Sequence, residues 1–447
     1  MADSYLNKTI SSTGNRRKFT ISTWIKRSKL GVAQIFANAF YANSDSGFTS
    51  LRFNSNDKLE FTGWSTAWFV STQVFRDTSS WYHIVVAVDT ENSTAGDRVR
   101  VYVNGSEMTA FDTENNPSVN QDLAFNVSSY IHDVGANRYQ GSSGVNTYNG
   151  FISHFALVDG QQLTPTSFGE TDATSGIWKF KSPSGISWGT NGVHLKFENS
   201  GALGTDSSGQ GNNYTVNGTL KQSIDTPSNV YPTLNPSFNL SDIQLTEAGM
   251  RTKNTNSNWK YINSTLAAPS GKWYCEHKIN INGGYVMVGV TDMQYATSQD
   301  KNSYTHCGAG TGGVGFYNAD GNKYLQASAS TFASSYTTGD IIGCALDMDN
   351  NKVYFSKNGA WANGSGGYGS STFDAAVGAI TLPTTSATYG FAVSVRSSAV
   401  VQSNFGTGQF GATTITSAGA NGNGSLFEYD VPSGYYALNT KNINTYG

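Results

Sequence analysis

The chain has 447 residues, of which only 13% are charged, and its net charge is −3. This balance supplies no basic face of the kind that nucleic-acid binding needs, so no nucleic-acid partner is expected. Gly is abundant, with 49 residues, and aromatic side chains make up 13% of the chain. Few Lys and Glu together with many aromatic and β-branched residues favour sheets over helices, so we expect an all-β protein of two or three domains.

The sequence contains no apolar run near the ~18 residues of a membrane-spanning helix, so no membrane insertion is expected. The N-terminal stretch from Met1 to Lys8 has no apolar signal core, which predicts synthesis in the cytoplasm without a signal peptide. Cys275, Cys307 and Cys344 are too few and too scattered for a disulfide framework or a zinc site. We therefore interpret them as buried free thiols.

Alternating apolar and polar residues predict a first set of strands. The stretches 19–27, 81–89, 98–105 and 148–159 are the clearest of these, and the last is apolar on both faces, as a central strand would be. The specific pieces are Phe19-Thr20-Ile21-Ser22-x-Trp24, Trp81-Tyr82-His83-Ile84, Val101-Tyr102-Val103-Asn104-Gly105, and Asn149-Gly150-Phe151-Ile152 running to Leu163-Thr164. Together they resemble a laminin G-like, concanavalin-type jelly roll over about the first 165 residues.

The stretch 186–222 resembles the opening strand and loop of such a jelly roll, although it follows the body of the domain. The pieces that carry this resemblance are Leu195-Lys196-Phe197 and Asp206-Ser207-Ser208-Gly209-Gln210-Gly211-Asn212-Asn213. We therefore expect 186–222 to return and complete a first sandwich that spans 1–222. Several of the nine prolines lie in 223–240, which we interpret as a linker.

A second sandwich is predicted over 241–410. Within it, 339–359 reads as a strand, a turn at Asp349-Asn350-Asn351, a returning strand and an Asn358-Gly359 turn. The stretches 271–279, 286–290, 389–395 and 403–406 resemble a SPRY domain. The final stretch, 411–447, combines a Gly/Asn-rich spacer with an aromatic tail that we expect to dock on a neighbouring surface. The fold class is thus two antiparallel β-sandwiches in series with a short C-terminal extension.

The jelly roll, the SPRY-like domain and the tail Pro432-x-Gly434-x-x-Ala437-Leu438 together resemble structural proteins of marine tailed bacteriophages. The resemblance implies a protein of the virion surface, in a tail fibre or another appendage. Its implied partners are other virion proteins and a host-surface glycan, and a homo-oligomer is expected. A capsid decoration protein with a purely structural role is the alternative, and a glycan hydrolase is a further one.

Concanavalin-type folds also serve glucanases, which resemble one another in a Glu-x-Asp-x-x-Glu strand. Retaining hydrolysis needs two carboxylates about 5 Å apart. Glu60, Glu198 and Glu276 are each isolated in the sequence, so we expect no enzyme and assign no catalytic residue.

Glycan binding needs aromatic platforms for the CH-rich faces of sugars, with hydrogen-bonding groups on the surrounding loops. Loop-like stretches of both domains carry aromatic residues and one histidine that fit this need. The candidates are Trp64, Trp68 and Phe69 in the first domain, and Tyr295, Tyr304, His306, Trp361 and Tyr368 in the second. The alternative is that these side chains fill small cores beneath the loops.

Calcium is the one cofactor that the sequence suggests, because laminin G-like relatives often bind it at the rim of the jelly roll. Asp206, Asn212 and Asn213 supply oxygen atoms in a glycine-rich loop, and Asp89 and Asp97 flank another. Asp and Asn also stabilise turns without any metal, so both interpretations stand at this point.

Overall fold

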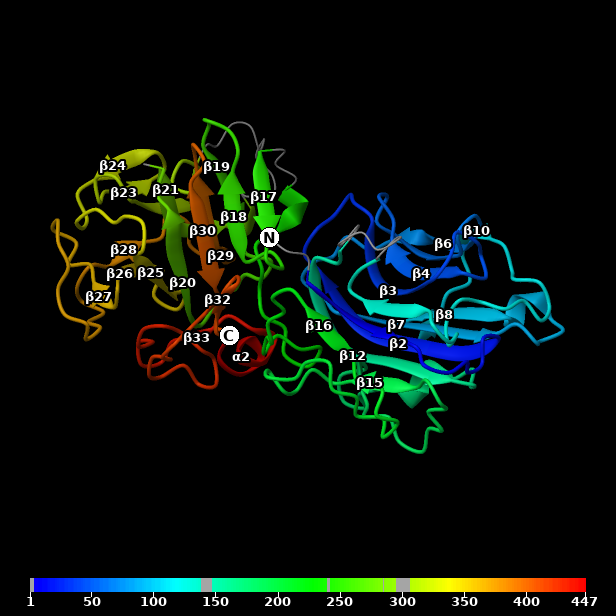
Figure 1. Ribbon diagram of the computed structural model, residues 1–447. Helices are drawn as coiled ribbons and strands as arrows, with labels where there is room; N and C mark the ends of the chain where they lie inside the picture. The colour runs from blue at the N-terminus through cyan, green and yellow to red at the C-terminus, as the bar shows by residue number, and fades with distance from the viewer. Residues whose placement is uncertain (1–3, 138–146, 239–241, 284, 295–305) are drawn as a thin grey trace. The chain divides into compact units, whose positions relative to one another are not determined.

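The computed structural model describes all residues except 1–3, 138–146, 239–241, 284 and 295–305. Its regular structure is almost entirely β, and the one α-helix of the described residues is α2 (Thr440–Tyr446), which confirms the all-β prediction. The chain forms two compact units, Met1–Gln222 and Ser223–Gly447 (Figure 1). Within the described residues, no helix has the length and apolar character to cross a membrane.

The N-terminal unit is a sandwich of two antiparallel sheets, which Figure 1 shows as separate layers. The larger sheet has the order β10 (Phe111–Glu114), β6 (Ala67–Val74), β5 (Lys58–Thr62), β4 (Phe48–Phe53), β3 (Gln34–Phe40), β11 (Ile131–Val134), β1 (Tyr5–Thr9) and β16 (Thr215–Asn217). The smaller sheet has the order β15 (Val193–Leu195), β12 (Gly150–Asp159), β2 (Lys18–Arg27), β7 (Tyr82–Asp89), β8 (Val99–Val103) and β9 (Ser106–Glu107). A separate ribbon pairs β13 (Gly169–Thr171) with β14 (Trp178–Phe180).

Alternation along each strand explains the core of this unit. Phe19, Ile21 and Ile25 of β2 point inward, where they pack in one cluster with residues of the larger sheet such as Phe36 and Leu51. The late strands β15 and β16 pair with β12 and β1, so the segment that follows the main body contributes to both sheets.

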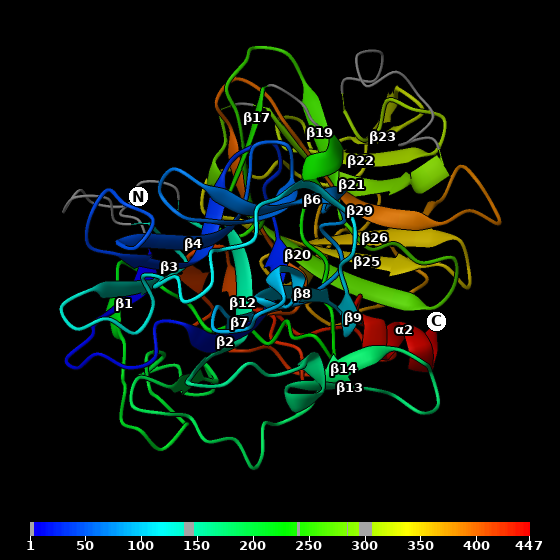
Figure 2. The same ribbon diagram turned by 90° about the vertical axis from the view of Figure 1, so that its right-hand side faces the viewer.

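The C-terminal unit is a second sandwich. Its larger sheet has the order β17 (Ile243–Thr246), β18 (Arg251–Asn254), β30 (Val400–Asn404), β20 (Lys272–Ile281), β25 (Ile341–Asp347), β26 (Lys352–Lys357) and β27 (Ala360–Trp361), with β28 (Ile380–Thr381) paired to β26. Its smaller sheet has the order β19 (Lys260–Asn263), β29 (Tyr389–Val395), β21 (Val286–Asp292), β22 (Gly313–Tyr317), β23 (Lys323–Leu325) and β24 (Ser328–Ser330). Figure 2 separates the layer of β21, β22 and β29 from that of β25 and β26.

The β25–β26 hairpin has the predicted form. Its strands pair from Ile342 to Asp347, and the turn that follows β26 has positive φ at both Asn358 and Gly359, as a type I′ turn requires. A short ribbon of β31 (Gln409–Phe410) and β32 (Thr413–Thr414) then leads into the C-terminal tail.

The segments expected to be a linker and a tail both pack within the C-terminal unit. Tyr231 and Leu234 are buried, so the described part of the expected linker, 223–238, contributes to the core of this unit rather than forming a free connection. In the tail, Phe427 and Tyr435 are buried against the larger sheet. The strand β33 (Tyr436–Ala437) also extends this sheet by pairing with β20 in parallel.

Candidate functional site

Exposed aromatic side chains gather at one end of the larger sheet of the N-terminal unit. The ends of β3 and β5 meet the starts of β4 and β11 there, because neighbouring strands are antiparallel. Tyr41 is 61% exposed, and its ring stacks on that of Tyr130 with centroids 4.8 Å apart. Trp64 is 42% exposed and meets the edge of Phe48 at 5.9 Å. We call Tyr41, Tyr130, Trp64 and Phe48 the aromatic rim.

Hydrogen bonds fix the loops that carry the aromatic rim. The carboxylate of Asp45 accepts from the backbone amides of Ser65 and Thr66, at 2.7 and 3.3 Å, and from both of their hydroxyls. Partial burial acts to raise the pKa of Asp45, but these bonds outweigh it and hold the pKa below its ordinary value. Arg16 donates to the Ser46 carbonyl at 3.0 Å and also pairs with Asp122.

Trp68 and Phe69, predicted as ligand platforms, lie instead in the hydrophobic core. Trp68 is only 1% exposed and packs against Phe61 with ring centroids 5.1 Å apart, and Phe69 packs against Phe111. Their stretch forms strand β6 between β5 and β10 rather than a loop. The β5–β6 pairing shifts register between Phe61 and Thr62, opposite these two residues, and such an irregularity allows both neighbouring side chains to join the core. Only Trp64 of the three candidates in this unit belongs to the aromatic rim.

A second aromatic group lies on the face of the smaller C-terminal sheet that is turned away from the main core. The ring of Trp259 is 6.0 Å from Tyr285, 5.7 Å from His306 and 5.7 Å from Tyr317. The guanidinium of Arg396 lies 4.4 Å from the centre of the Tyr285 ring. All of these side chains are partly exposed, and we call them the tyrosine cluster together with Tyr324, which touches His306.

Of the other candidates in the C-terminal unit, the two that the structure describes do not join the tyrosine cluster. Tyr295 and Tyr304 lie outside the described residues. Trp361 is buried with Phe427 of the tail in one hydrophobic cluster. Tyr368 is half-buried, and its hydroxyl donates to the Ser334 carbonyl at 2.9 Å.

The Asp206 loop does not fit a calcium ion. The Asp206 carboxylate accepts from the amides of His194, Ser208 and Asn212 at 2.8 to 2.9 Å, and Asn213 accepts from the Asp206 amide. Asn212 uses its side-chain NH₂ group to reach the carbonyls of Thr190 and Gly192. Because N–H donors occupy these oxygen atoms, a cation would have to displace the bonds that shape the loop.

The second loop with paired aspartates is occupied in a similar way. Asp89 forms an ion pair with Lys18 at 2.9 Å, and Asp97 forms one with Arg100. Over the described part of the chain, no three His, Cys, Asp or Glu side chains are grouped as metal ligands would be.

One buried pair has the composition of a nucleophile and its base, but its protons are arranged differently. Ser22 Oγ lies 2.9 Å from His83 Nε2, and Trp178 Nε1 lies 2.9 Å from His83 Nδ1. An indole N–H can only donate, so Nδ1 accepts and the neutral ring carries its hydrogen on Nε2. His83 therefore donates to Ser22 and has no free lone pair with which to accept the serine proton.

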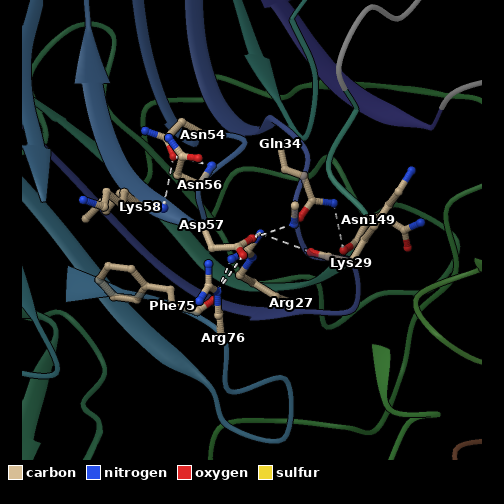
Figure 3. Close-up of polar contacts among 12 residues, drawn as sticks. Arg27, Lys29, Gln34, Asn54, Asn56, Asp57, Lys58, Phe75, Arg76 and Asn149 are labelled. Atoms are coloured by element: carbon tan, nitrogen blue, oxygen red, sulfur yellow. Dashed lines mark hydrogen bonds and ion pairs between the residues drawn. The ribbon is translucent and has the colours of Figure 1, made fainter. Parts of the chain in front are cut away.

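The end of the sandwich opposite the aromatic rim is closed by a buried charge network (Figure 3). Arg27 donates to Asp57 at 2.9 Å and to the Lys29 carbonyl at 3.1 Å. Asp57 also accepts from the Gly31 amide and from Arg76. Because these partners lie on separate loops, the network connects the end of β2 to the β4–β5 turn and, through Arg76, to the residues that follow β6.

Two family models match the chain. Residues 2–167 match the Concanavalin A-like lectin/glucanases superfamily, and residues 272–406 match the SPRY domain. The predicted succession of a concanavalin-like domain and a SPRY domain is therefore confirmed.

Two similar proteins each match a short stretch of the sequence of this chain. The Ran-binding proteins 9/10 homolog of Drosophila melanogaster is 31% identical over 101 residues, which are 21% of this chain and 10% of that protein. Ran-binding protein 9 of Danio rerio is 30% identical over 101 residues and 15% of its length. The chain thus spans less than a fifth of the length of these relatives.

Two solved structures are among those that match part of this chain. The SPRY domain of human HERC1 has 22% identity and a TM-score of 0.28, and the match covers 38% of this chain and 96% of that one. A pentraxin from Limulus polyphemus has 18% identity and a TM-score of 0.29, over 36% of this chain and 72% of that one.

Proposed function

We propose that this chain is a non-enzymatic recognition protein that binds a glycan through the aromatic rim of its N-terminal unit. The observation that carries the proposal is the exposure of Tyr41 and Trp64 on loops that hydrogen bonds already hold in place. Large exposed aromatic rings offer stacking surfaces to the apolar faces of sugars. Loops that are already ordered lose little entropy when a ligand binds.

The charges beside the aromatic rim favour a neutral glycan. Both carboxylate oxygens of Asp45 accept hydrogen bonds from Ser65 and Thr66, and Arg16 is engaged by Asp122 and by the carbonyls of Ser46 and Leu123. An anionic sugar would therefore meet a cation that is already neutralised. Serine and threonine hydroxyls supply the uncharged hydrogen-bonding groups that a hexose needs.

We place this recognition on the surface of a bacteriophage virion, in a tail fibre or another appendage. Support comes from the charge-poor composition, the Gly- and Asn-rich loops, and the resemblance of the domain order and tail to phage structural proteins. In this proposal the chain is made in the host cytoplasm and assembles with other virion proteins, as a homo-oligomer.

A structural role in virion assembly is the second candidate, and the tyrosine cluster favours it. Tyr, Trp and Arg are the residue types enriched at the centres of protein interfaces, and Tyr285, Trp259 and Arg396 supply all three. The SPRY match over the strands that carry this cluster also supports contact with a protein. In this role the chain would decorate the capsid without binding a glycan.

Binding of the full chain to a glycan array, and to host cells, tests the first proposal. We expect Tyr41→Ala and Trp64→Ala each to reduce binding at least tenfold, while Trp259→Ala in the tyrosine cluster leaves it unchanged. Binding that survives both rim substitutions would reject the aromatic rim as the site. Loss of virion incorporation in Trp259→Ala, with no glycan bound by the wild type, would favour the decoration role. Release of reducing sugar from a bound polysaccharide would show an enzyme instead.

A further inference from the structure

Three histidines on the outer face of the smaller N-terminal sheet are each covered by an aromatic ring. His83, His154 and His194 belong to β7, β12 and β15, which lie in one sheet with β2 between β7 and β12. The covering rings all come from the stretch 169–188, which we call the cover segment. The pairs are Trp178 on His83 (centroids 6.0 Å apart, planes at 18°), Phe180 on His154 (3.5 Å, 11°) and Trp188 on His194 (5.7 Å, 13°).

The indole of Trp178 packs closely between two glycines. Its Nε1 donates to His83 Nδ1 at 2.9 Å, and Gly105 and Gly169 flank the ring. A Cβ added at either glycine would lie 2.5 Å from the indole. Protonation of His83 would place a second N–H opposite that of Trp178, so the bond cannot survive the charged state of the histidine.

The other two histidines also lack partners that would stabilise a proton. Their rings are 5.7 Å apart, and His154 Nδ1 and His194 Nε2 are buried without a hydrogen-bond partner. Burial lowers the pKa of His83 to about 3 and the pKa of His154 and His194 to about 4. Neighbouring positive charges lower the pKa further: His154 acts on His83, and His194 and Lys196 act on His154. At His194, Lys196 lowers the pKa and Asp206 raises it.

The remaining charged groups near this face do not compensate a protonated histidine. Lys26 lies on the same outer face of β2, over the ring of Phe151. On the cover segment, Lys179 pairs with Glu170 and Asp172, so these two carboxylates are already neutralised. Lys181 donates to the Thr166 carbonyl.

The cover segment depends on these ring contacts because its backbone is largely self-contained. β13 and β14 hydrogen-bond to each other as a separate two-stranded sheet. Most of the residues in 172–187 are exposed, and Trp178 and Phe180 are only half-buried. Loss of the ring contacts would therefore remove much of what holds the segment in place.

We propose that the cover segment is released by acid, because protons taken up by His83, His154 and His194 displace it from the outer face of the smaller sheet. An exposed histidine regains its ordinary pKa of 6.5, so the open state binds more protons than the closed state at any pH between about 4 and 6.5. The closed state therefore has its full stability above pH 6.5. Its stability relative to the open state decreases as the pH falls from about 6.5 to 4. Release uncovers His83, whose ring also stacks on that of Trp24.

Hydrogen exchange of the full chain, followed by mass spectrometry at pH 7 and pH 5, measures this release. Between these pH values the opening equilibrium should increase by about 20-fold for each histidine that becomes exposed. We expect this increase in peptides from 169–188, after correction for the intrinsic exchange rate, and no comparable change in peptides from β2. Equal protection of the cover segment at both pH values would overturn the proposal.

Single substitutions separate the effect of histidine protonation from the effect of side-chain packing. His154 has a φ of 49°, which Asn also tolerates, so His154→Asn removes one titrating group while keeping the backbone. We expect it to reduce the pH response of the cover segment by about 20-fold, whereas a merely structural role would lower protection equally at both pH values. Gly169→Ala should displace the indole and open the segment already at pH 7.

The matched control is Gly96→Ala, because a Cβ there would meet nothing within 4 Å. It should reproduce the wild-type response. If His154→Asn does not fold, as judged by circular dichroism at pH 7, His194→Gln makes the same comparison. A full wild-type response in whichever of these two variants folds would reject the histidines as the cause.

Discussion

Arg27 and Asp57 form an ion pair of 2.9 Å in which the arginine side chain is fully buried and the aspartate nearly so. The guanidinium also donates to backbone carbonyls, and its Cζ lies 4.3 Å from the centre of the Phe53 ring. Such a pair is costly to break, because removal of one partner leaves the other charge buried and uncompensated.

We therefore expect Asp57→Asn to lower the free energy of unfolding by about 3–5 kcal/mol. Asp57 has a φ of 63°, which Asn adopts readily, so the loss reports the charge and not the backbone. Arg76, the second partner of Asp57, is 60% exposed, and Arg76→Gln should cost no more than about 1 kcal/mol. Urea unfolding of both variants measures the difference, and equal losses would show that burial does not decide the cost.

Trp64 and Trp68 give opposite expectations although they are four residues apart. Trp68→Ala should destabilise the chain by about 3–5 kcal/mol, because it empties a space in the core. Trp64→Ala should change stability by less than about 1 kcal/mol and affect ligand binding alone. Thermal unfolding and glycan binding, measured on both variants, test this division of roles. A strongly destabilised Trp64→Ala would mean that the aromatic rim serves packing.

Periodicity was sufficient to predict the strands. The stretches 81–89 and 339–359 became β7 and the β25–β26 hairpin, because alternation along a strand is a local property that a partly buried sheet imposes. The aromatic rim depends instead on contacts between distant residues. Tyr41 and Tyr130 meet only because β3 pairs with β11, which no local pattern shows. For the same reason the burial of Trp68 could not be predicted.

The histidine and aromatic pairs illustrate a further limit. His83 is fully buried and His154 is partly buried, and both belong to strands of the smaller sheet. Their partners Trp178 and Phe180 lie in a stretch without clear periodicity, so the sequence gives no reason to pair them. The only local sign is that the two rings are two residues apart, which places them on one face of a strand.

Calcium should have no effect on the stability of this chain. The Asp206 carboxylate stabilises its loop through hydrogen bonds from three backbone amides, so the loop is complete without a cation. We expect the same melting temperature in millimolar CaCl₂ and in EDTA, measured by differential scanning calorimetry. Asp206→Ala should lower the free energy of unfolding by about 1–3 kcal/mol, because it leaves three partly buried amides without their acceptor. A calcium-dependent rise in melting temperature that this variant abolishes would contradict the hydrogen-bond interpretation.

Glu276 attaches the C-terminal tail to the larger sheet of its unit. Its carboxylate is buried and accepts from the amides of Glu428 and Tyr429 at 2.8 and 2.9 Å, and Asn404 and Tyr274 also donate to it. Burial raises the pKa of Glu276 to about 7, although these hydrogen bonds act in the opposite direction. The native state thus holds a proton that the unfolded chain releases near its ordinary pKa of 4.5.

The pH dependence of stability follows from this difference. Between about pH 4.5 and 7 the native state binds more protons at Glu276 than the unfolded state, so the free energy of unfolding falls as the pH rises. The contribution is complete below pH 4.5, is lost by about pH 7, and amounts to at most about 3 kcal/mol. Glu276→Gln cannot titrate and should remove this part of the dependence. It should also cost about 1–2 kcal/mol at pH 5, because its NH₂ group faces a backbone amide.

Urea unfolding at pH 5 and pH 8 provides the measurement, and the difference between wild type and variant at the two pH values isolates Glu276 from every other titrating group. Glu198→Gln is the matched control, since that side chain is 70% exposed and its substitution should leave the pH dependence unchanged. A Glu276→Gln variant that loses stability between pH 5 and pH 8 as steeply as the wild type would mean that Glu276 stays charged in the native state. The backbone amides of the tail would then outweigh burial, and the tail would be held by a buried carboxylate.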